Sequence, residues 1–349
     1  MLIIPEQPPA HLSGTKNSQA STAFRFALIG LGKIGRVHLD NIAGLENVRV
    51  VAIAEPNKAN LKGVDESIRL FDDWSETLSD TEVDGVIITL PHSMHAECAM
   101  LALQNGKHVF LEKPLATTLE DAQRLMRCAQ ETGLTLMVNM THRFYPPLRM
   151  ARRMLQEGVV GDIISVHDHY MEVIDRADFP AWFFDPEIAG GGVTMTDSIH
   201  LVDRVSWLIG EPLQLKGQVS RTLDPDSKIE DCSELICQSP SGMPVTVGSF
   251  FSFDGARTWN DRLTLFGSKG TLVVHAWSHL EWTPHAEKTQ RIEGYPLGLS
   301  HLQRAALGHR AAMEEFLSAV SEKRISEAEA SCVMNAHEII HDFYNNLSF

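Results

Sequence analysis

Short apolar segments alternate with amphipathic ones over the first 140 residues of the chain. Five of them are rich in Val, Ile and Leu: Phe24–Ile29, Val48–Ala54, Gly85–Leu90, His108–Leu111 and Thr135–Asn139. Apolar runs of this length are typical of parallel strands that are buried on both faces. Because the segments between them have helical periodicity, a doubly wound parallel sheet is expected over residues 24–141.

One of the intervening helices has clear boundaries in the sequence. Its apolar stripe consists of Leu119, Ala122, Leu125, Met126 and Ala129. Thr118 is a suitable N-cap, acidic residues follow it in the first turn, and Gly133 stands just after the last turn. The pattern therefore predicts a helix between Thr118 and Gly133.

The pattern changes after about residue 141. A helix is expected near Pro147–Gln156, and six alternating segments with turn signals between them follow: IISVHDHYMEV, PLQLKGQVSRTL, DCSELICQSP, MPVTVGSFFSF, DRLTLFGSKGTLVV and HLEWTP. Alternation of this kind predicts a mainly antiparallel sheet. The segments after Ser300 have helical periodicity. The expected architecture is a flexible arm over residues 1–23, a nucleotide-binding domain over 24–141, and a sheet domain with closing helices over 142–349.

Composition and charge narrow the possible functions. The 349 residues include 30 Lys and Arg against 45 Asp and Glu, which gives a net charge of −15, so nucleic acid and anionic membranes are not expected partners. No apolar run approaches the length of a membrane helix, and residues 1–22 lack the pattern of a signal peptide. The five cysteines form no CxxC pair, which is typical of reduced thiols in the cytoplasm.

A glycine-rich turn joins the first expected strand to a helix. Gly30, Gly32 and Gly35 form a GxGxxG pattern, with Lys33 and Ile34 inside it. In this context the glycines permit a tight turn, close approach of a pyrophosphate, and close packing of helix on strand. The pyrophosphate would bind at the helix N-terminus. The turn predicts a dinucleotide site.

An acidic residue supports the same interpretation. Glu55 ends the second expected strand, twenty residues after Gly35, where a carboxylate accepts hydrogen bonds from the adenosine ribose. It would repel a 2′-phosphate, which favours NAD over NADP. Lys58 lies close enough in sequence that NADP is not excluded.

Residues suited to proton transfer follow several of the expected strands. Glu112 and Lys113 come directly after a buried strand, at the sheet edge where ligands of such folds bind. Asp197 and His200 are three residues apart on an expected helix that starts near Thr196, so they share a face. An imidazole beside a carboxylate is typical of a tuned acid or base.

Other histidines leave alternatives open. His167 and His169 lie on one face of a strand and with His200 could form a zinc site, although the spacing indicates no further ligand, and no metal is expected. Two loops at the ligand edge carry further candidates, each of which could also be an ordinary surface loop: His92 and His95 in one, and His142, Arg143 and Tyr145 in the other.

Taken in order, these motifs resemble the Gfo/Idh/MocA family, the group of glucose–fructose oxidoreductase and inositol dehydrogenase. The resemblance runs from about Phe24 to the C-terminus. It includes the glycine turn, TLPHSMHAECAMLALQNGKHVFLEKPLATT, NMTHRFYPPL, WFFDPEIAGGGVTMTDSIHLVDRVSWLIGEP and LFGSKGTLVV. It implies a Rossmann domain followed by a domain with a large open sheet, whose outer face forms homodimers or homotetramers.

The resemblance also implies roles for individual residues. Lys113 matches the lysine that helps to move the substrate hydroxyl proton, and His200 the histidine that acts as or assists the general base. Glu112 would lie by the nicotinamide ribose, with Pro91 and His95 on the adenosine or ribose side. The substrate-binding residues that it implies are Arg143, Tyr145, His169, Trp182, Thr196, Asp197 and His200.

Two positions depart from the family pattern. Thr196 stands where many sugar dehydrogenases of the family carry aspartate, and on a regular helix Asp197 is rotated from it by about 100°. Phe183 follows Trp182 where arginine is frequent, which favours a less anionic substrate or one with an aromatic part. Transfer of a particular substrate from the family is therefore unsafe.

The leading hypothesis is an NAD(P)-dependent oxidoreductase acting on a secondary alcohol or ketone of a sugar, cyclitol or related polyol, with Lys113, His200 and Asp197 as catalytic residues. One alternative is an NAD-dependent enzyme that cleaves glycosides by oxidation, elimination and reduction. The other is a non-catalytic NAD-binding sensor, which the presence of both Lys113 and His200 disfavours. Neither the substrate, nor the direction of reaction, nor the oligomer size follows from the sequence.

Overall fold

The computed structural model describes residues 23–224, 227–253, 255, 260–328 and 330–346. The arm expected over residues 1–23 lies outside these residues except for Ala23. A six-stranded, fully parallel sheet comes first, in the order β3-β2-β1-β4-β5-β6. Its strands are β1 (Phe24–Ile29), β2 (Val48–Ala54), β3 (Arg69–Phe71), β4 (Gly85–Ile88), β5 (His108–Leu111) and β6 (Leu136–Val138). The doubly wound sheet is confirmed, with one short strand, β3, that the sequence did not predict.

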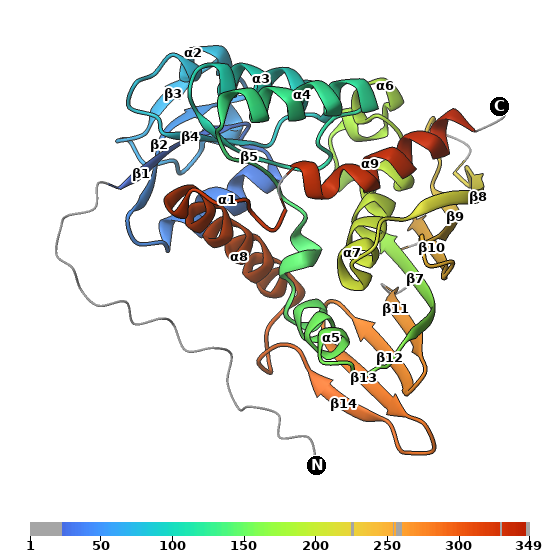
Figure 1. Ribbon diagram of the computed structural model, residues 1–349. Helices are drawn as coiled ribbons and strands as arrows, with labels where there is room; N and C mark the ends of the chain where they lie inside the picture. The colour runs from blue at the N-terminus through green and yellow to red at the C-terminus, as the bar shows by residue number, and fades with distance from the viewer. Residues whose placement is uncertain (1–22, 225–226, 254, 256–259, 329, 347–349) are drawn as a thin grey trace.

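Helices cover both faces of this sheet (Figure 1). They are α1 (Lys33–Ala43), α2 (Trp74–Leu78), α3 (His95–Gln104) and α4 (Leu119–Thr132). The expected boundaries of α4 are confirmed: the Thr118 hydroxyl accepts a hydrogen bond from the Asp121 N–H at 3.1 Å, and Gly133 ends the helix at φ +66°.

The second sheet has eight strands in the order β14-β13-β12-β11-β7-β10-β9-β8. Only the β10–β7 pair is parallel, so the expectation of a mainly antiparallel sheet is confirmed. The strands are β7 (Ile163–Val173), β8 (Gln214–Arg221), β9 (Cys232–Gln238), β10 (Pro244–Ser252), β11 (Asn260–Gly267), β12 (Gly270–His275), β13 (His279–Pro284) and β14 (Gln290–Glu293).

Helices lie against one face of the second sheet: α5 (Pro146–Gln156) contacts β12, and α7 (Ile199–Ile209) contacts β7. A buried ion cluster holds α7 in place. The Arg204 guanidinium donates to Asp168 of β7 at 2.5 and 2.7 Å and to Asp261 of β11 at 2.8 Å, and all three side chains are buried. Because each charge has a partner, the burial of this arginine is tolerated.

The chain end returns to the first domain. The long helix α8 (His301–Glu322) packs beside α1, and α9 (Ala330–Asn345) bridges α4 and α7 (Figure 1). Phe316 of α8 is fully buried, with ring centroids 5.8 Å from Phe26 and 5.5 Å from Phe110. The C-terminal segment therefore supplies part of the helical layer on the nucleotide-binding sheet.

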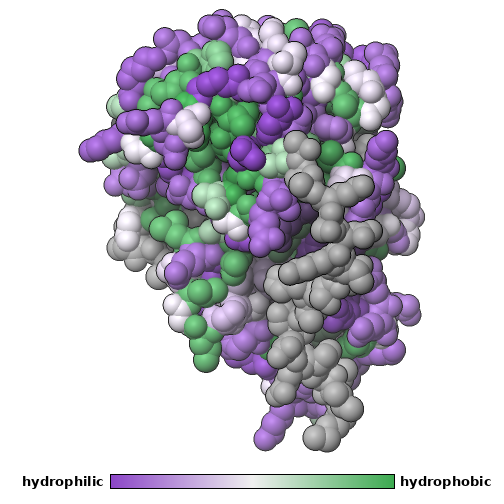
Figure 2. All heavy atoms as spheres, turned by 90° about the vertical axis from the view of Figure 1, so that its left-hand side faces the viewer, coloured by the Kyte–Doolittle hydropathy of each residue, from purple (hydrophilic) through white to green (hydrophobic). Residues whose placement is uncertain are grey.

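Within the described residues, no helix combines the length and hydrophobicity needed to cross a membrane. On the face that Figure 2 shows, hydrophobic and hydrophilic residues are interspersed in patches. The short helix α6 (Pro186–Ala189) and several single-turn helices complete the connections.

Candidate active site

A cavity of about 400 Å³ lies where the carboxyl ends of the parallel strands meet the second sheet and α7. Of the candidate site residues from the sequence, fourteen line it: Gly32, Lys33, Ile34, His92, His95, Glu112, Lys113, His142, Tyr145, Trp182, Phe183, Thr196, Asp197 and His200. Eight others do not: Gly30, Gly35, Glu55, Lys58, Pro91, Arg143, His167 and His169. Residues from distant parts of the sequence thus converge on one enclosed space.

The glycine turn forms one end of the cavity. Gly30 has φ +90°, a conformation that favours glycine, and a Cβ on Gly35 would lie 2.3 Å from the carbonyl oxygen of Gly30. A Cβ on Gly32 would meet nothing within 4 Å, so the backbone there is open to a ligand. Because α1 begins directly after Gly32 without a side-chain cap, its first N–H groups are available to an anion. These features fit a dinucleotide phosphate group.

Glu55 lies beside this turn at the end of β2. Its carboxylate accepts hydrogen bonds from the Leu31 N–H at 2.7 Å and the Asn57 N–H at 2.8 Å. The ammonium of Lys58 pairs with Asp72 and not with the glycine turn. A fixed negative charge therefore stands next to the turn, while the nearest candidate cation is engaged elsewhere.

Lys113 reaches across the cavity from the end of β5. Its ammonium donates a 2.7 Å hydrogen bond to the carbonyl oxygen of Thr196, just before α7. The peptide bond to Pro114 is cis. The hydrogen bond to Thr196 holds the lysine on the same cavity as His200.

His200 is in the first turn of α7, and its ring stacks on His142 with 4.4 Å between centroids. Its Nδ1 is buried and has no hydrogen-bond partner. Burial, aided by the positive charge of Lys113, holds the pKa of His200 well below its usual value. The imidazole is therefore neutral near pH 7 and able to accept a proton.

The segment before α7 differs from the regular helix that the sequence predicted. Residues Thr194–Ser198 form a π turn, and the α-helix begins only at Ile199. Such turns insert an extra residue, which shifts the side chains around them. Thr196 and Asp197 both line the cavity, while the Thr196 hydroxyl donates to the Gly192 carbonyl at 3.1 Å. The rotation expected between these two positions thus does not carry Asp197 away from the site.

A second carboxyl group, which the sequence did not indicate, accompanies Asp197. Glu172, near the end of β7, also lines the cavity. Burial raises the pKa of Glu172 to about 6. Burial together with the neighbouring charge of Glu172 raises the pKa of Asp197 well above its usual value.

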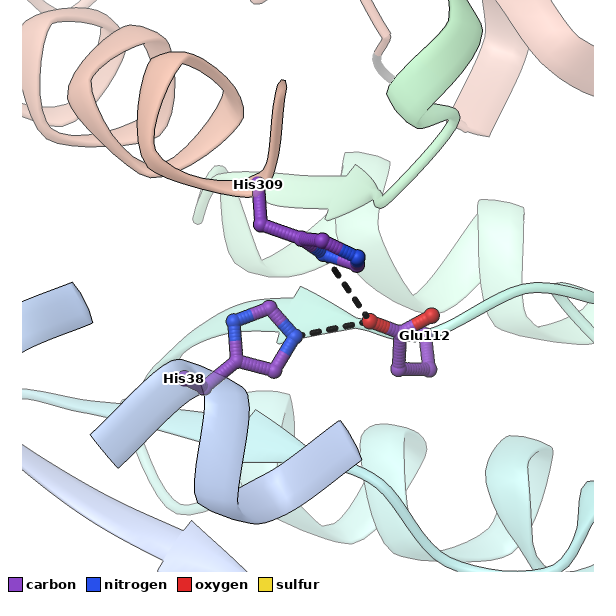
Figure 3. A group of neighbouring side chains, drawn as sticks. All are labelled: His38, Glu112 and His309. Atoms are coloured by element: carbon purple, nitrogen blue, oxygen red, sulfur yellow. Dashed lines mark hydrogen bonds and ion pairs between the residues drawn. The ribbon is translucent and has the colours of Figure 1, made fainter. Parts of the chain in front are cut away.

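Glu112 is the centre of a buried polar cluster at the other side of the cavity (Figure 3). Its Oε1 contacts His38 Nε2 at 2.7 Å and accepts a bond from Asn139 at 2.6 Å, while His309 Nδ1 of α8 lies 4.0 Å away. The imidazoles and the amide outweigh the effect of burial and lower the pKa of Glu112 to about 2. Glu112 is thus held as a carboxylate. Within the described residues, two clusters have side chains close enough together to hold a metal ion: His38, Glu112 and His309, and His275, His279 and Glu281.

Two predicted substrate contacts are not in the cavity. The Arg143 guanidinium bonds Asp203 of α7 at 2.6 and 2.8 Å, and both side chains are buried. His169 points to the open face of the second sheet, where it pairs with Glu234 at 3.0 Å. A buried ion pair and strand alternation direct these side chains elsewhere, and a role of either residue in substrate binding stays a prediction.

The remaining histidines also have local partners. His167 forms a hydrogen bond with the Thr246 hydroxyl on the same open sheet face. His167 and His169 are therefore separated from His200, which lines the cavity, and the three do not form a zinc site. Both ring nitrogens of His95 contact backbone carbonyls, of Pro114 at 2.7 Å and Leu90 at 2.8 Å. His95 lines the cavity, but its polar atoms serve the surrounding backbone.

Comparison with known proteins agrees with this geometry. Residues 24–140 match the family model described as "Oxidoreductase family, NAD-binding Rossmann fold", and residues 148–273 match the "GFO/IDH/MocA C-terminal domain". The chain belongs to the Gfo/Idh/MocA family of NAD(P)-dependent oxidoreductases that act on CH–OH groups.

Individual relatives are distant. A 4-carboxy-2-hydroxymuconate-6-semialdehyde dehydrogenase from Sphingobium sp. is 26% identical over 90% of this chain and 96% of its own length. An inositol 2-dehydrogenase from Rhizobium meliloti is 27% identical over 72% of this chain and 75% of its own. A structure of levoglucosan dehydrogenase in complex with NADH and levoglucosan superposes with a TM-score of 0.80 at 20% identity, covering 93% of this chain and 96% of that one. At that identity, the structural likeness bears on the fold.

Proposed function

We propose that the protein transfers hydride between NAD and the carbinol carbon of a sugar, cyclitol or related polyol. The observation that carries the proposal is that Lys113 and His200, from different domains, open onto one cavity whose far end is the glycine turn. The relatives named above include an inositol dehydrogenase, which supports a polyol as substrate.

Each residue has a task in this proposal. When bound, NAD supplies the acceptor or donor of hydride. The Lys113 ammonium donates a hydrogen bond to the alcohol oxygen, and the neutral imidazole of His200 takes up the hydroxyl proton during oxidation. Glu112 accepts a hydrogen bond from the ribose, and Asp197 binds a second polar group of the substrate. The aromatic side chains of Tyr145 and Trp182 cover the apolar face of the sugar ring and exclude water.

NAD is the preferred cofactor in this proposal. The Glu55 carboxylate beside the glycine turn disfavours the additional phosphate of NADP, and Lys58 is paired with Asp72. Activity with NADP is expected to be lower at every substrate concentration.

The test is a panel of sugars, inositols and glycosides incubated with NAD or NADP, with absorbance of the reduced cofactor and product release followed together. Net reduction of NAD with a polyol supports the proposal. Release of sugar from a glycoside without net reduction of NAD would instead indicate glycoside cleavage by oxidation, elimination and reduction. Cofactor binding without turnover of any compound would indicate a sensor.

We further propose that the protein works in the cytoplasm as a homodimer or homotetramer formed through the open face of the second sheet. Exposed apolar residues on that face, Val219 of β8, Ile236 of β9 and Phe266 of β11, support this assembly. The four cysteines whose side chains the structure describes are unpaired, and three of them are buried, which supports a cytoplasmic location. Light scattering of the purified protein measures the assembly, and a monomer at micromolar concentration would contradict it.

A further inference from the structure

Two carboxyl groups face the cavity on its substrate side. Glu172 lies near the end of β7, and Asp197 lies in the π turn before α7, on the segment whose Thr196 carbonyl bonds Lys113. Both acids lie within electrostatic range of Lys113, and Glu172 also lies within range of Lys33 in the glycine turn.

Glu172 and Asp197 are half-buried, and they differ from other acids in the interior of the protein. Glu112, Asp168 and Asp203 each bond a histidine or arginine side chain. In contrast, neither Glu172 nor Asp197 forms a salt bridge or side-chain hydrogen bond within the described part of the chain, and Asp197 Oδ2 is buried without a partner. Ionising a carboxyl group without a partner in such a site is costly, so a ligand that supplies a partner for the charged form is favoured.

The cations of the cavity, Lys113 and Lys33, act on these acids through space: both lower the pKa of Glu172 and Lys113 lowers that of Asp197, but neither forms a salt bridge or hydrogen bond to them. The Lys113 ammonium is bonded to a carbonyl oxygen, and the Lys33 ammonium lies over the Phe179 ring at the glycine-turn end, where a cofactor phosphate would engage it. Among the described residues that line the cavity there is no arginine. His142 and His200 add no charge near pH 7, because burial holds the pKa of each well below its usual value.

Aromatic rings flank the acids. Tyr170 precedes Glu172 on β7, and Trp182 and Phe183 form the facing wall, with 6.0 Å between their ring centroids. Carboxylates combined with aromatic faces are the chemistry that recognises an ammonium group, through charge-assisted hydrogen bonds and cation–π attraction. An ammonium placed between Glu172 and Asp197 would favour the ionised form of both carboxyl groups, whereas a substrate carboxylate or phosphate would meet the negative charge of Glu172.

We propose that the preferred substrate is an amino polyol, an amino sugar or aminocyclitol, whose protonated amine is bound by Glu172 and Asp197 while a neighbouring hydroxyl reacts. This inference rests on the proposed function for the identity of the reaction. A neutral polyol fits the same cavity but offers the two carboxyl groups no cationic partner, and an acidic sugar is disfavoured.

Calorimetric titration of the protein–NADH complex tests the inference independently of turnover. The probes are D-glucose, D-glucosamine and D-glucuronate, together with scyllo-inositol and its monoamino analogue. In each set the amine is expected to bind roughly 10–100-fold more tightly than the neutral compound, as charge-assisted hydrogen bonds imply. The acid is expected to bind most weakly.

Two single substitutions test whether Glu172 and Asp197 cause the preference for the amine. Glu172→Gln and Asp197→Asn should each weaken binding of the amine at least tenfold and binding of the neutral analogue less than threefold. Glu157→Gln removes an exposed carboxylate at the end of α5, far from the cavity lining, and should leave the ratio unchanged. Circular dichroism before titration identifies a variant that fails to fold, in which case the other variant provides the test.

The outcomes separate the two proposals. Equal or tighter binding of the neutral compound, or an equal loss for both compounds in Glu172→Gln, overturns the amine preference. Selective amine binding with no redox turnover of any polyol supports the preference and overturns the proposed reaction. Turnover of neutral polyols without preferential binding of the amine supports the proposed reaction and overturns the amine preference.

Discussion

At the residue scale, the Lys113 ammonium is held by the carbonyl oxygen of Thr196 and faces the cavity next to His200. Lys113→Met keeps the length of the side chain but removes its charge and its donor. We expect kcat to fall by about 10²–10⁴, as loss of acid–base catalysis implies. NADH binding, measured by fluorescence, should remain nearly intact because the glycine turn is unchanged.

The control for this substitution is Lys62→Met, which removes an exposed lysine and should leave kcat unchanged. Turnover of Lys113→Met within about tenfold of the parent protein would show that the lysine has no essential part in proton transfer.

Glu172 gives the free protein a pH dependence of stability. Its folded-state pKa is raised from 4.5 to about 6, so the folded protein holds this proton more tightly than the unfolded chain does. The contribution of Glu172 to the free energy of unfolding is complete below about pH 4.5 and is lost as the pH rises through 6. The loss at pH 7.5 is at most about 2 kcal/mol.

Glu172→Gln should therefore unfold at a higher temperature than the parent at pH 7.5, in the absence of ligands, and the difference should shrink towards pH 4.5. Calorimetric scans at the two pH values measure it. A variant that is less stable than the parent at pH 7.5 would show that the carboxylate has a favourable partner in solution.

The sequence predicted many of the residues around the cavity, because motifs place Glu112, Lys113 and His200 at fixed positions of their elements. It did not predict Glu172, since one acid on an alternating strand carries no distinctive signal. His309 was also missed, because nothing in a long amphipathic helix indicates which turn of α8 meets Glu112. It also did not indicate that Arg143 pairs with Asp203, since the two residues are sixty positions apart.

At the element scale, helix α4 depends on its N-cap. Thr118→Ala removes the hydroxyl that accepts the Asp121 N–H, and we expect a loss of about 1 kcal/mol in the free energy of unfolding, measured with urea. Gln123→Ala, on the exposed face of the same helix, should change it by less than about 0.5 kcal/mol. Equal effects of the two substitutions would contradict a capping role.

Elements with strong local signals were predicted closely. The expected bounds of β1, β2, β5 and β7 match the structure, because each is a continuous apolar or alternating run. The edge strands β3 and β14 have three and four residues and are largely exposed, so they lack such a pattern. The π turn was missed for another reason: its apolar spacing is close to that of the α-helix it precedes.

At the scale of the whole molecule, α8 packs the C-terminal part of the chain against the N-terminal parallel sheet. Phe316→Ala would remove a fully buried ring that contacts the side chains of β1 and β5. We expect a loss of about 3–5 kcal/mol in the free energy of unfolding by urea, the usual cost of such a cavity. Leu302→Ala, on an exposed part of α8, should cost less than about 0.5 kcal/mol.

If Phe316→Ala proved as mild as Leu302→Ala, α8 would be only loosely attached to the nucleotide-binding sheet. The division of the chain at residue 142 remains a prediction, but α8 packs across it. The sequence could not show this, because an amphipathic helix does not reveal which sheet it will cover.

The return of α8 to the first sheet also affects how the protein is made. During synthesis the parallel strands leave the ribosome first, and Phe316 of the helix that shields Phe26 and Phe110 follows them by 290 and 206 residues. At about 5–20 residues per second, these two rings stay uncovered for about 10–60 s. The nascent chain should therefore bind chaperones that recognise apolar segments until translation has passed residue 322.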